Sequence, residues 1–100
     1  ELKKQRTAII QARSKELATH KKELEFCEEK IIELEEQLEE KNQLLQEASN
    51  QNNNSAMIEH SQSIGQIQNE IDELFERLEI TSELVDKIEY RYKVELEKLI

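Results

Sequence analysis

The feature that most constrains the fold of this chain is a pair of apolar columns, each repeating every seven residues. The first column contains Ile10, Leu17, Leu24, Ile31, Leu38 and Leu45, and the second contains Met57, Ile64, Ile71, Leu78, Val85, Tyr92 and Leu99. An apolar residue every seventh position gives a helix one continuous stripe to bury, which is typical of a coiled coil. The columns therefore predict two long helices.

The composition favours paired helices over a globular core. Apolar residues make up 36% of the chain, aromatic residues 4% and charged residues 37%, with no proline and a single glycine. A globular core needs more apolar volume, whereas a two-helix seam needs only about two apolar residues in seven. Because proline is the strongest helix breaker, its absence leaves both helices uninterrupted.

A polar segment at residues 49–55 separates the two columns and contains three consecutive asparagines. Asparagine side chains compete with helical backbone hydrogen bonds and favour turns, so the chain is expected to reverse there. We predict an all-α fold, a single domain spanning residues 1–100, in which two long helices form an antiparallel coiled-coil hairpin. The helices are expected at about 2–48 and 56–99. In this register Leu17 shares a layer with Ile88, and Leu34 with Ile71.

The chain shows no pattern typical of catalysis or of a cofactor site. It lacks a glycine-rich phosphate loop and zinc-type cysteine and histidine spacing, and a two-helix hairpin offers no concave pocket. Cys27 falls on the seam as a small core residue, and the predicted register places His20 and His60 too far apart to share an ion. We expect a protein that is not an enzyme and binds no cofactor or metal.

No apolar run approaches the roughly 18 residues that would cross a bilayer, so no membrane insertion is expected. The first residues lack the apolar block of a secretory signal, and a single cysteine cannot form a disulfide within the chain. These features favour a soluble, cytoplasmic protein. Because the chain opens directly in helical pattern, without a capping residue, we expect it to be a fragment of a longer protein.

The charge is distributed unevenly along the chain. The net charge of −9 argues against a nucleic-acid grip spread over the whole surface, but residues 1–22 hold seven basic side chains against two glutamates. The antiparallel register adds basic residues from the end of the second helix. The candidate nucleic-acid-binding residues are Lys3, Lys4, Lys15, Lys21, Lys22 and Arg91. Two interpretations stay open, namely phosphate contact and solubilising charges that pair with glutamates across the hairpin.

Residues 61–78, with the sequence SQSIGQIQNEIDELFERL, carry the most specific pattern in the chain. The positions that matter are Ile64, Ile67, Glu70, Ile71, Asp72, Leu74, Phe75, Arg77 and Leu78, preceded in the first helix by Glu28, Ile31, Leu34 and Glu35. This pattern resembles the C-terminal coiled-coil domain of the F subfamily of ATP-binding-cassette proteins, the Uup-like group. Two departures are the absence of a tryptophan after Arg77, where Leu78 stands, and of a lysine-rich lead-in.

The resemblance implies a non-catalytic accessory hairpin of a cytoplasmic ATPase that acts on ribosomes or nucleic acid. Nucleotide sites would then lie in other domains of the parent protein, and this hairpin would help to bind DNA or ribosomal RNA. The alternative is a spacer or protein-interaction coiled coil without nucleic-acid binding, which could self-associate as a homodimer. Phe26 and Ile32 fall outside the seam, and their roles stay open.

Overall fold

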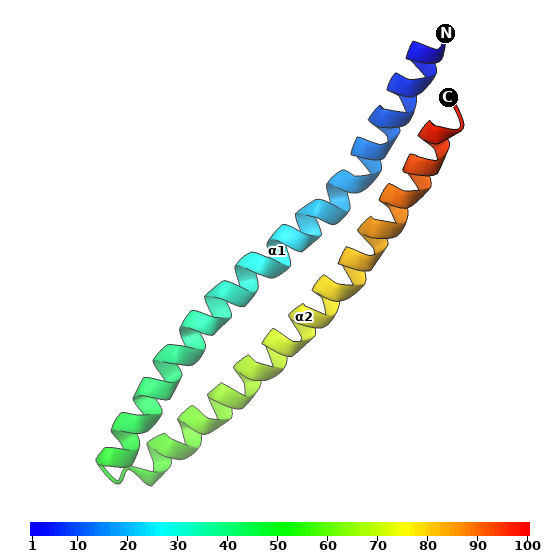
Figure 1. Ribbon diagram of the computed structural model, residues 1–100. Helices are drawn as coiled ribbons and strands as arrows, with labels where there is room; N and C mark the ends of the chain where they lie inside the picture. Colours follow the sequence, from blue (N-terminus) through cyan, green and yellow to red (C-terminus); the bar gives the residue numbers. More distant parts are fainter. The chain divides into compact units, whose positions relative to one another are not determined.

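The computed structural model describes residues 1–100 and contains two helices, α1 (Leu2–Asn50) and α2 (Asn54–Glu97), with no strands. The chain is 93% helical. The prediction of an all-α fold in which two long helices form an antiparallel hairpin is confirmed (Figure 1). Neither helix contains a segment that is long and apolar enough to cross a membrane.

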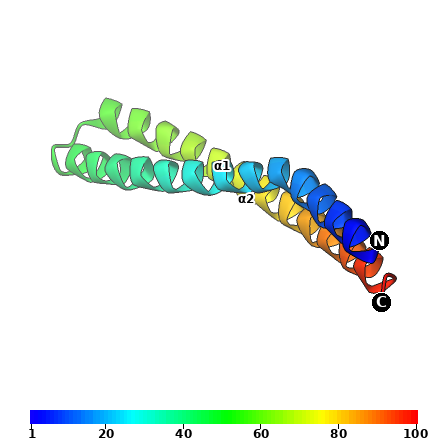
Figure 2. The same ribbon diagram turned by 90° about the horizontal axis from the view of Figure 1, so that it is seen from above.

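The chain forms two compact units, each built from one part of α1 and one part of α2. Unit 1 contains Glu1–Phe26 and Arg77–Ile100, and unit 2 contains Cys27–Glu76. Within each unit the two helix segments lie side by side (Figures 1 and 2). Unit 1 carries both chain termini, and unit 2 carries the connection between the helices.

The core of unit 1 contains three members of the predicted columns, together with Ile88, which lies three positions after Val85. Leu17, Val85, Ile88 and Tyr92 are buried and form one cluster, and Ile9 and Leu24 pack against it. Leu17 and Ile88, which the sequence places in one layer, are each only 4% exposed. Because one stripe per helix supplies these contacts, the outer faces of both helices remain available for other interactions.

The core of unit 2 combines two members of the predicted columns, Ile31 and Ile71, with residues that each lie three positions after a column member. Its buried apolar residues are Cys27, Ile31, Leu34, Ala48, Ile67, Ile71 and Leu74. Cys27 takes part in no disulfide and has no exposed surface, as expected for a small seam residue. Outside the two seams, Phe26 in unit 1 and Ile32 in unit 2 are both more than half exposed.

The connection between the helices is shorter than the polar segment from which it was predicted. Helix α1 continues to Asn50, and α2 begins at Asn54. Asn52 adopts a left-handed conformation with a φ of 54°. Its N–H donates to the carbonyl of Ser49 at 3.1 Å, and the Asn53 N–H donates to the carbonyl of Ala48 at 2.9 Å. This pair of bonds is the Schellman motif, which satisfies the last carbonyls of a helix.

Asn53 also begins the second helix. Its side-chain Oδ1 accepts a hydrogen bond from the Ala56 N–H at 3.1 Å, which is the bond expected of an N-cap residue. Its carbonyl accepts the first helical bond from Met57 at 3.0 Å. One asparagine therefore closes the end of α1 with its N–H and caps the start of α2 with its side chain. This double use explains why three residues are enough to reverse the chain.

Candidate nucleic-acid interface

The two units differ strongly in charge. Unit 1 holds twelve basic and ten acidic side chains, for a net charge of +2, whereas unit 2 holds two basic and thirteen acidic side chains, for a net charge of −11. All six candidate residues predicted from the sequence belong to unit 1. The charge distribution therefore favours unit 1 over unit 2 as a contact for an anionic ligand.

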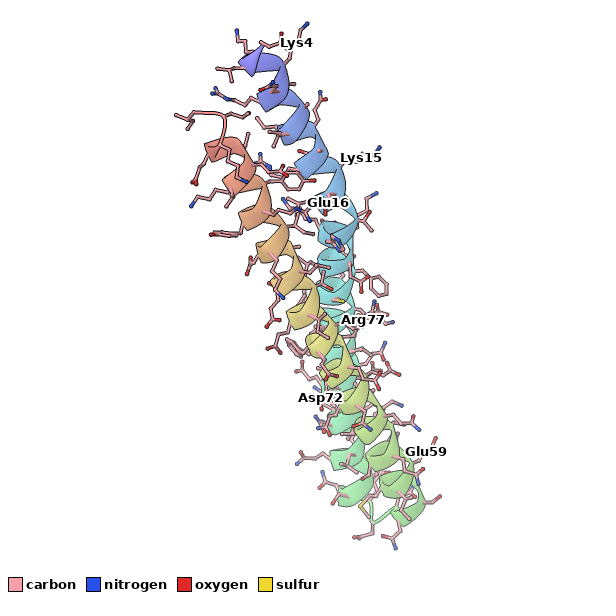
Figure 3. The ribbon with its side chains drawn as sticks, turned by 90° about the vertical axis from the view of Figure 1, so that its right-hand side faces the viewer. Lys4, Lys15, Glu16, Glu59, Asp72 and Arg77 are labelled. Carbon is pink, nitrogen blue, oxygen red and sulfur yellow. The ribbon has the colours of Figure 1, made fainter.

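Three lysines form one stripe along α1. Lys4, Lys15 and Lys22 are separated by 11 and 7 residues, and both spacings return to nearly the same side of a helix. All three side chains are exposed, and Figure 3 shows Lys4 and Lys15 on the same helix. Lys15 lies about 200° around the helix from the buried Leu17, so the stripe faces away from the core. We call these three residues the outward stripe.

The surface between the lysines carries almost no negative charge. Glu16 is the only acidic residue from position 3 to position 22. Short or neutral side chains share the outward face, namely Thr7, Ala8, Gln11 and Ala18. Lys3 and Lys21 lie roughly 100° around the helix from the outward stripe. None of these five lysines makes an ion pair or a hydrogen bond, so cross-hairpin pairing does not use them.

Arg91, the sixth candidate, is engaged within unit 1. Its guanidinium donates to the carboxylate of Glu16 and lies 4.9 Å from the centre of the Tyr92 ring. The Tyr92 hydroxyl donates to the same Glu16 oxygen. The hydrogen bond from Tyr92, followed by that from Arg91, lowers the pKa of Glu16, and the same bond to Glu16 raises the pKa of Tyr92. The one negative charge between positions 3 and 22 is therefore compensated.

A second pair repeats this arrangement on the same side of unit 1. Arg77 donates to the Glu23 carboxylate through Nε at 3.1 Å and through a second guanidinium nitrogen, and its guanidinium lies 5.7 Å from the centre of the Phe26 ring. Glu23 follows Glu16 by two helical turns, and Arg77 precedes Arg91 by four. We call this side, defined by Glu16, Glu23, Arg77 and Arg91, the paired flank. Figure 3 labels Glu16 and Arg77.

Arg91 is a candidate predicted from the sequence, but its partner Glu16 was not predicted. The predicted register places Glu16 opposite position 89, and Arg91 and Tyr92 follow within one helical turn. This proximity in the predicted register is the sequence feature that could have indicated the contacts among Glu16, Arg91 and Tyr92. The choice of Arg91 over nearby Lys87 or Lys93 depends on which side of α2 borders the glutamate, and this requires the helix rotation that the structure supplies.

The chain has no candidate metal site. No group of three or more His, Cys, Asp or Glu side chains is arranged to hold a metal ion. In unit 2 the ion pair is between neighbours on α1, Lys30 and Glu33, at 3.7 Å. The carboxylates of unit 2 are otherwise a solvated surface.

No family model, curated protein or solved structure matches this chain. The resemblance to the F subfamily of ATP-binding-cassette proteins therefore rests on the pattern at residues 61–78 and its counterpart in α1.

Proposed function

We propose that unit 1 is a non-catalytic module that contacts the phosphates of DNA or structured RNA through the outward stripe. The observation that carries the proposal is that the lysines of this stripe are exposed and unpaired. Lys4, Lys15 and Lys22 share one exposed face of α1 without a carboxylate partner, while the nearby Glu16 carboxylate is bound to Arg91 and Tyr92. Lysines placed in this way bind phosphates as point charges and release counterions from the nucleic acid.

The arrangement predicts binding without sequence specificity. The stripe spans about 27 Å along the helix, and the small side chains between the lysines leave room for a phosphate backbone to approach. The face offers no aromatic side chain on which bases could stack. Because unit 2 carries a net charge of −11, contact is expected to be confined to unit 1 and to weaken steeply with added salt.

The parent protein proposed for this hairpin is a cytoplasmic ATPase that resembles the F subfamily of ATP-binding-cassette proteins. The pattern at residues 61–78 supports this assignment, and a helical hairpin is the fold that the resemblance implies. In that setting, the hairpin would be an accessory arm that holds the ATPase on ribosomal RNA or DNA, and catalysis would belong to the other domains.

A second candidate function is a protein-interaction coiled coil. Large apolar side chains outside the seams support it, since Ile32 is 59% exposed and Ile80 is 64% exposed. Exposed apolar groups on a helical surface are available to a partner, although single ones are also common on protein surfaces. Binding measurements with nucleic acid discriminate between the two candidates.

The test compares two variants with the same net charge. In the first, Lys4, Lys15 and Lys22 are changed to glutamine; in the second, the exposed unit 2 residues Gln37, Gln43 and Gln46 are changed to glutamate. Fluorescence anisotropy with labelled duplex DNA and a structured RNA is measured at low salt.

We expect the lysine variant to lose at least about tenfold in affinity, because three phosphate contacts are lost. The glutamate variant should stay within about threefold of the affinity of the original chain. Equal losses in both variants would show that only net charge matters. No binding by the unchanged chain at any salt would leave the protein-interaction function.

A further inference from the structure

The side of unit 1 opposite the paired flank contains a groove between α1 and α2, so the expectation that a two-helix hairpin offers no concave pocket is wrong. One part, of about 410 Å³, is lined by Arg6, Ile10, Arg13, Lys93, Leu96, Glu97 and Ile100. A second part, of about 620 Å³, is lined by Arg13, Ser14, Leu17, Ala18, Lys21, Glu89 and Lys93. Because the two parts share Arg13 and Lys93, they form one continuous groove, which we call the open flank.

The open flank has an apolar floor. Ile10 is 38% exposed and Leu96 is partly buried, so apolar surface in the groove is left uncovered. Leu17, at the bottom of the second part, belongs to the core of unit 1. An occupant of this groove therefore needs an apolar face of its own.

The rims of the open flank are basic and unpaired. Arg6, Arg13, Lys21 and Lys93 outnumber the two lining carboxylates, Glu89 and Glu97. None of these four cations makes an ion pair or a hydrogen bond within the chain. Arg13 is partly buried at a seam position, where its guanidinium offers five donors without a protein acceptor.

The two flanks differ in whether their basic side chains have carboxylate partners. On the paired flank each arginine of α2 has a glutamate of α1 as its partner, namely Arg91 with Glu16 and Arg77 with Glu23. On the open flank, cations from both helices line one groove and have no such partner. An occupant that supplies carboxylates would therefore complement this groove.

The geometry points to an acidic amphipathic helix of a partner protein as the occupant of the open flank. Its apolar side chains would cover Ile10 and Leu96, and its carboxylates would pair with Arg13 and Lys93 across the groove. From Arg6 to Lys21 the groove follows α1 for about 22 Å, which corresponds to a helix of about four turns. The result would be a local three-helix bundle, assembled by helix-in-groove docking.

Other occupants fit the open flank less well. A phosphate backbone would satisfy the cations but would leave the apolar floor exposed. The acidic segment of α1 in a second copy already buries its apolar stripe, including Ile31 and Leu34, in the seam of unit 2. The proposal does not depend on the outward stripe, since Lys4, Lys15 and Lys22 are absent from the groove lining.

The test uses a labelled synthetic helix of about four turns, with leucines along one face and glutamates beside them. A control peptide has the same composition in an order that gives no apolar face. Anisotropy is measured for the unchanged chain, for Arg13→Glu with Lys93→Glu, and for Lys4→Glu with Lys15→Glu. The two double variants have the same net charge, and circular dichroism checks that each is folded. If Arg13→Glu lowers the helix content, Arg13→Gln with Lys93→Gln replaces it, matched by Lys4→Gln with Lys15→Gln.

We expect the amphipathic peptide to bind at least about tenfold more tightly than the control peptide. The groove variant should lose about tenfold or more in affinity, and the outward variant should stay within about threefold. Equal binding of both peptides, or equal losses in the two variants, would overturn the proposal. A second copy would be the occupant instead if the unchanged chain did not bind the peptide but formed a dimer that the groove variant abolished. Nucleic acid would be the occupant instead if the groove variant lost duplex DNA binding as fully as the outward variant. Either result would overturn the proposal.

Discussion

The three consecutive asparagines at the turn provide a sharp test of the fold, because the structure gives them three different roles. Asn52 adopts the left-handed conformation that ends α1, Asn53 caps both helices, and Asn54 is the first residue of α2. Replacing each by alanine in turn changes the same side chain at neighbouring positions. The expected effects on the free energy of unfolding nevertheless differ.

The magnitudes follow from the contacts that each side chain makes. Asn53→Ala removes the hydrogen bond to the Ala56 N–H and should cost about 1 kcal/mol, as is usual for an N-cap. Asn52→Ala places a Cβ without a polar side chain at a φ of 54° and should also cost about 1 kcal/mol. Asn54→Ala removes no side-chain hydrogen bond and adds a better helix former, so its effect should lie within about 0.5 kcal/mol of zero.

The assay is urea unfolding followed by far-ultraviolet circular dichroism. With a slope of about 1 kcal/mol per molar urea, a loss of 1 kcal/mol moves the midpoint down by about 1 M. Asn53→Gly is a further control, since glycine is tolerated at an N-cap and should cost only a few tenths of a kcal/mol. The reasoning would be refuted if Asn54→Ala were as damaging as Asn53→Ala, or if Asn52→Ala had no effect.

Three further predictions concern other parts of the chain. Gly65→Ala should stabilise α2 by roughly 1 kcal/mol, because an added Cβ meets no atom within 4 Å; a lower urea midpoint would contradict this. Cys27 should react with a thiol reagent only after unfolding, since it has no exposed surface, and rapid labelling in buffer would show that unit 2 opens readily. The extra stability of the unchanged chain over Tyr92→Phe should be constant between about pH 5 and pH 9. This extra stability should be lost as pH falls through the lowered pKa of Glu16, because the carboxylate is then protonated. It should also be lost as pH rises through the raised pKa of Tyr92, because the hydroxyl then ionises. A stability difference that is independent of pH would contradict the role of this hydrogen bond.

The core was predictable because its signal is periodic. Leu17, Ile31, Ile71 and Val85 fall on the seven-residue columns, and all four are buried. Periodicity carries no information about the turn, where adjacent asparagines are chemically identical and only the backbone conformation distinguishes Asn52. For this reason a seven-residue polar loop was expected where three residues connect the helices.

The candidate site was predictable only in part, for a related reason. Helical spacing alone places Lys4, Lys15 and Lys22 on one face, so the outward stripe can be read from the sequence. The fate of Arg91 depends on its position relative to Glu16 on a different helix, which requires both register and rotation. The sequence also does not predict which flank is paired and which is open, because charged residues of both signs occur on each helix.

The most direct test of the central claim is the salt dependence of nucleic-acid binding by unit 1. The logarithm of the duplex DNA binding constant is measured against the logarithm of salt concentration for the unchanged chain and for the variant with Lys4, Lys15 and Lys22 changed to glutamine. Each lost phosphate contact lowers the slope by about 0.9, so three lost contacts should make it shallower by about 2.7. An unchanged slope, with or without a change in affinity, would contradict the claim that these lysines bind phosphates.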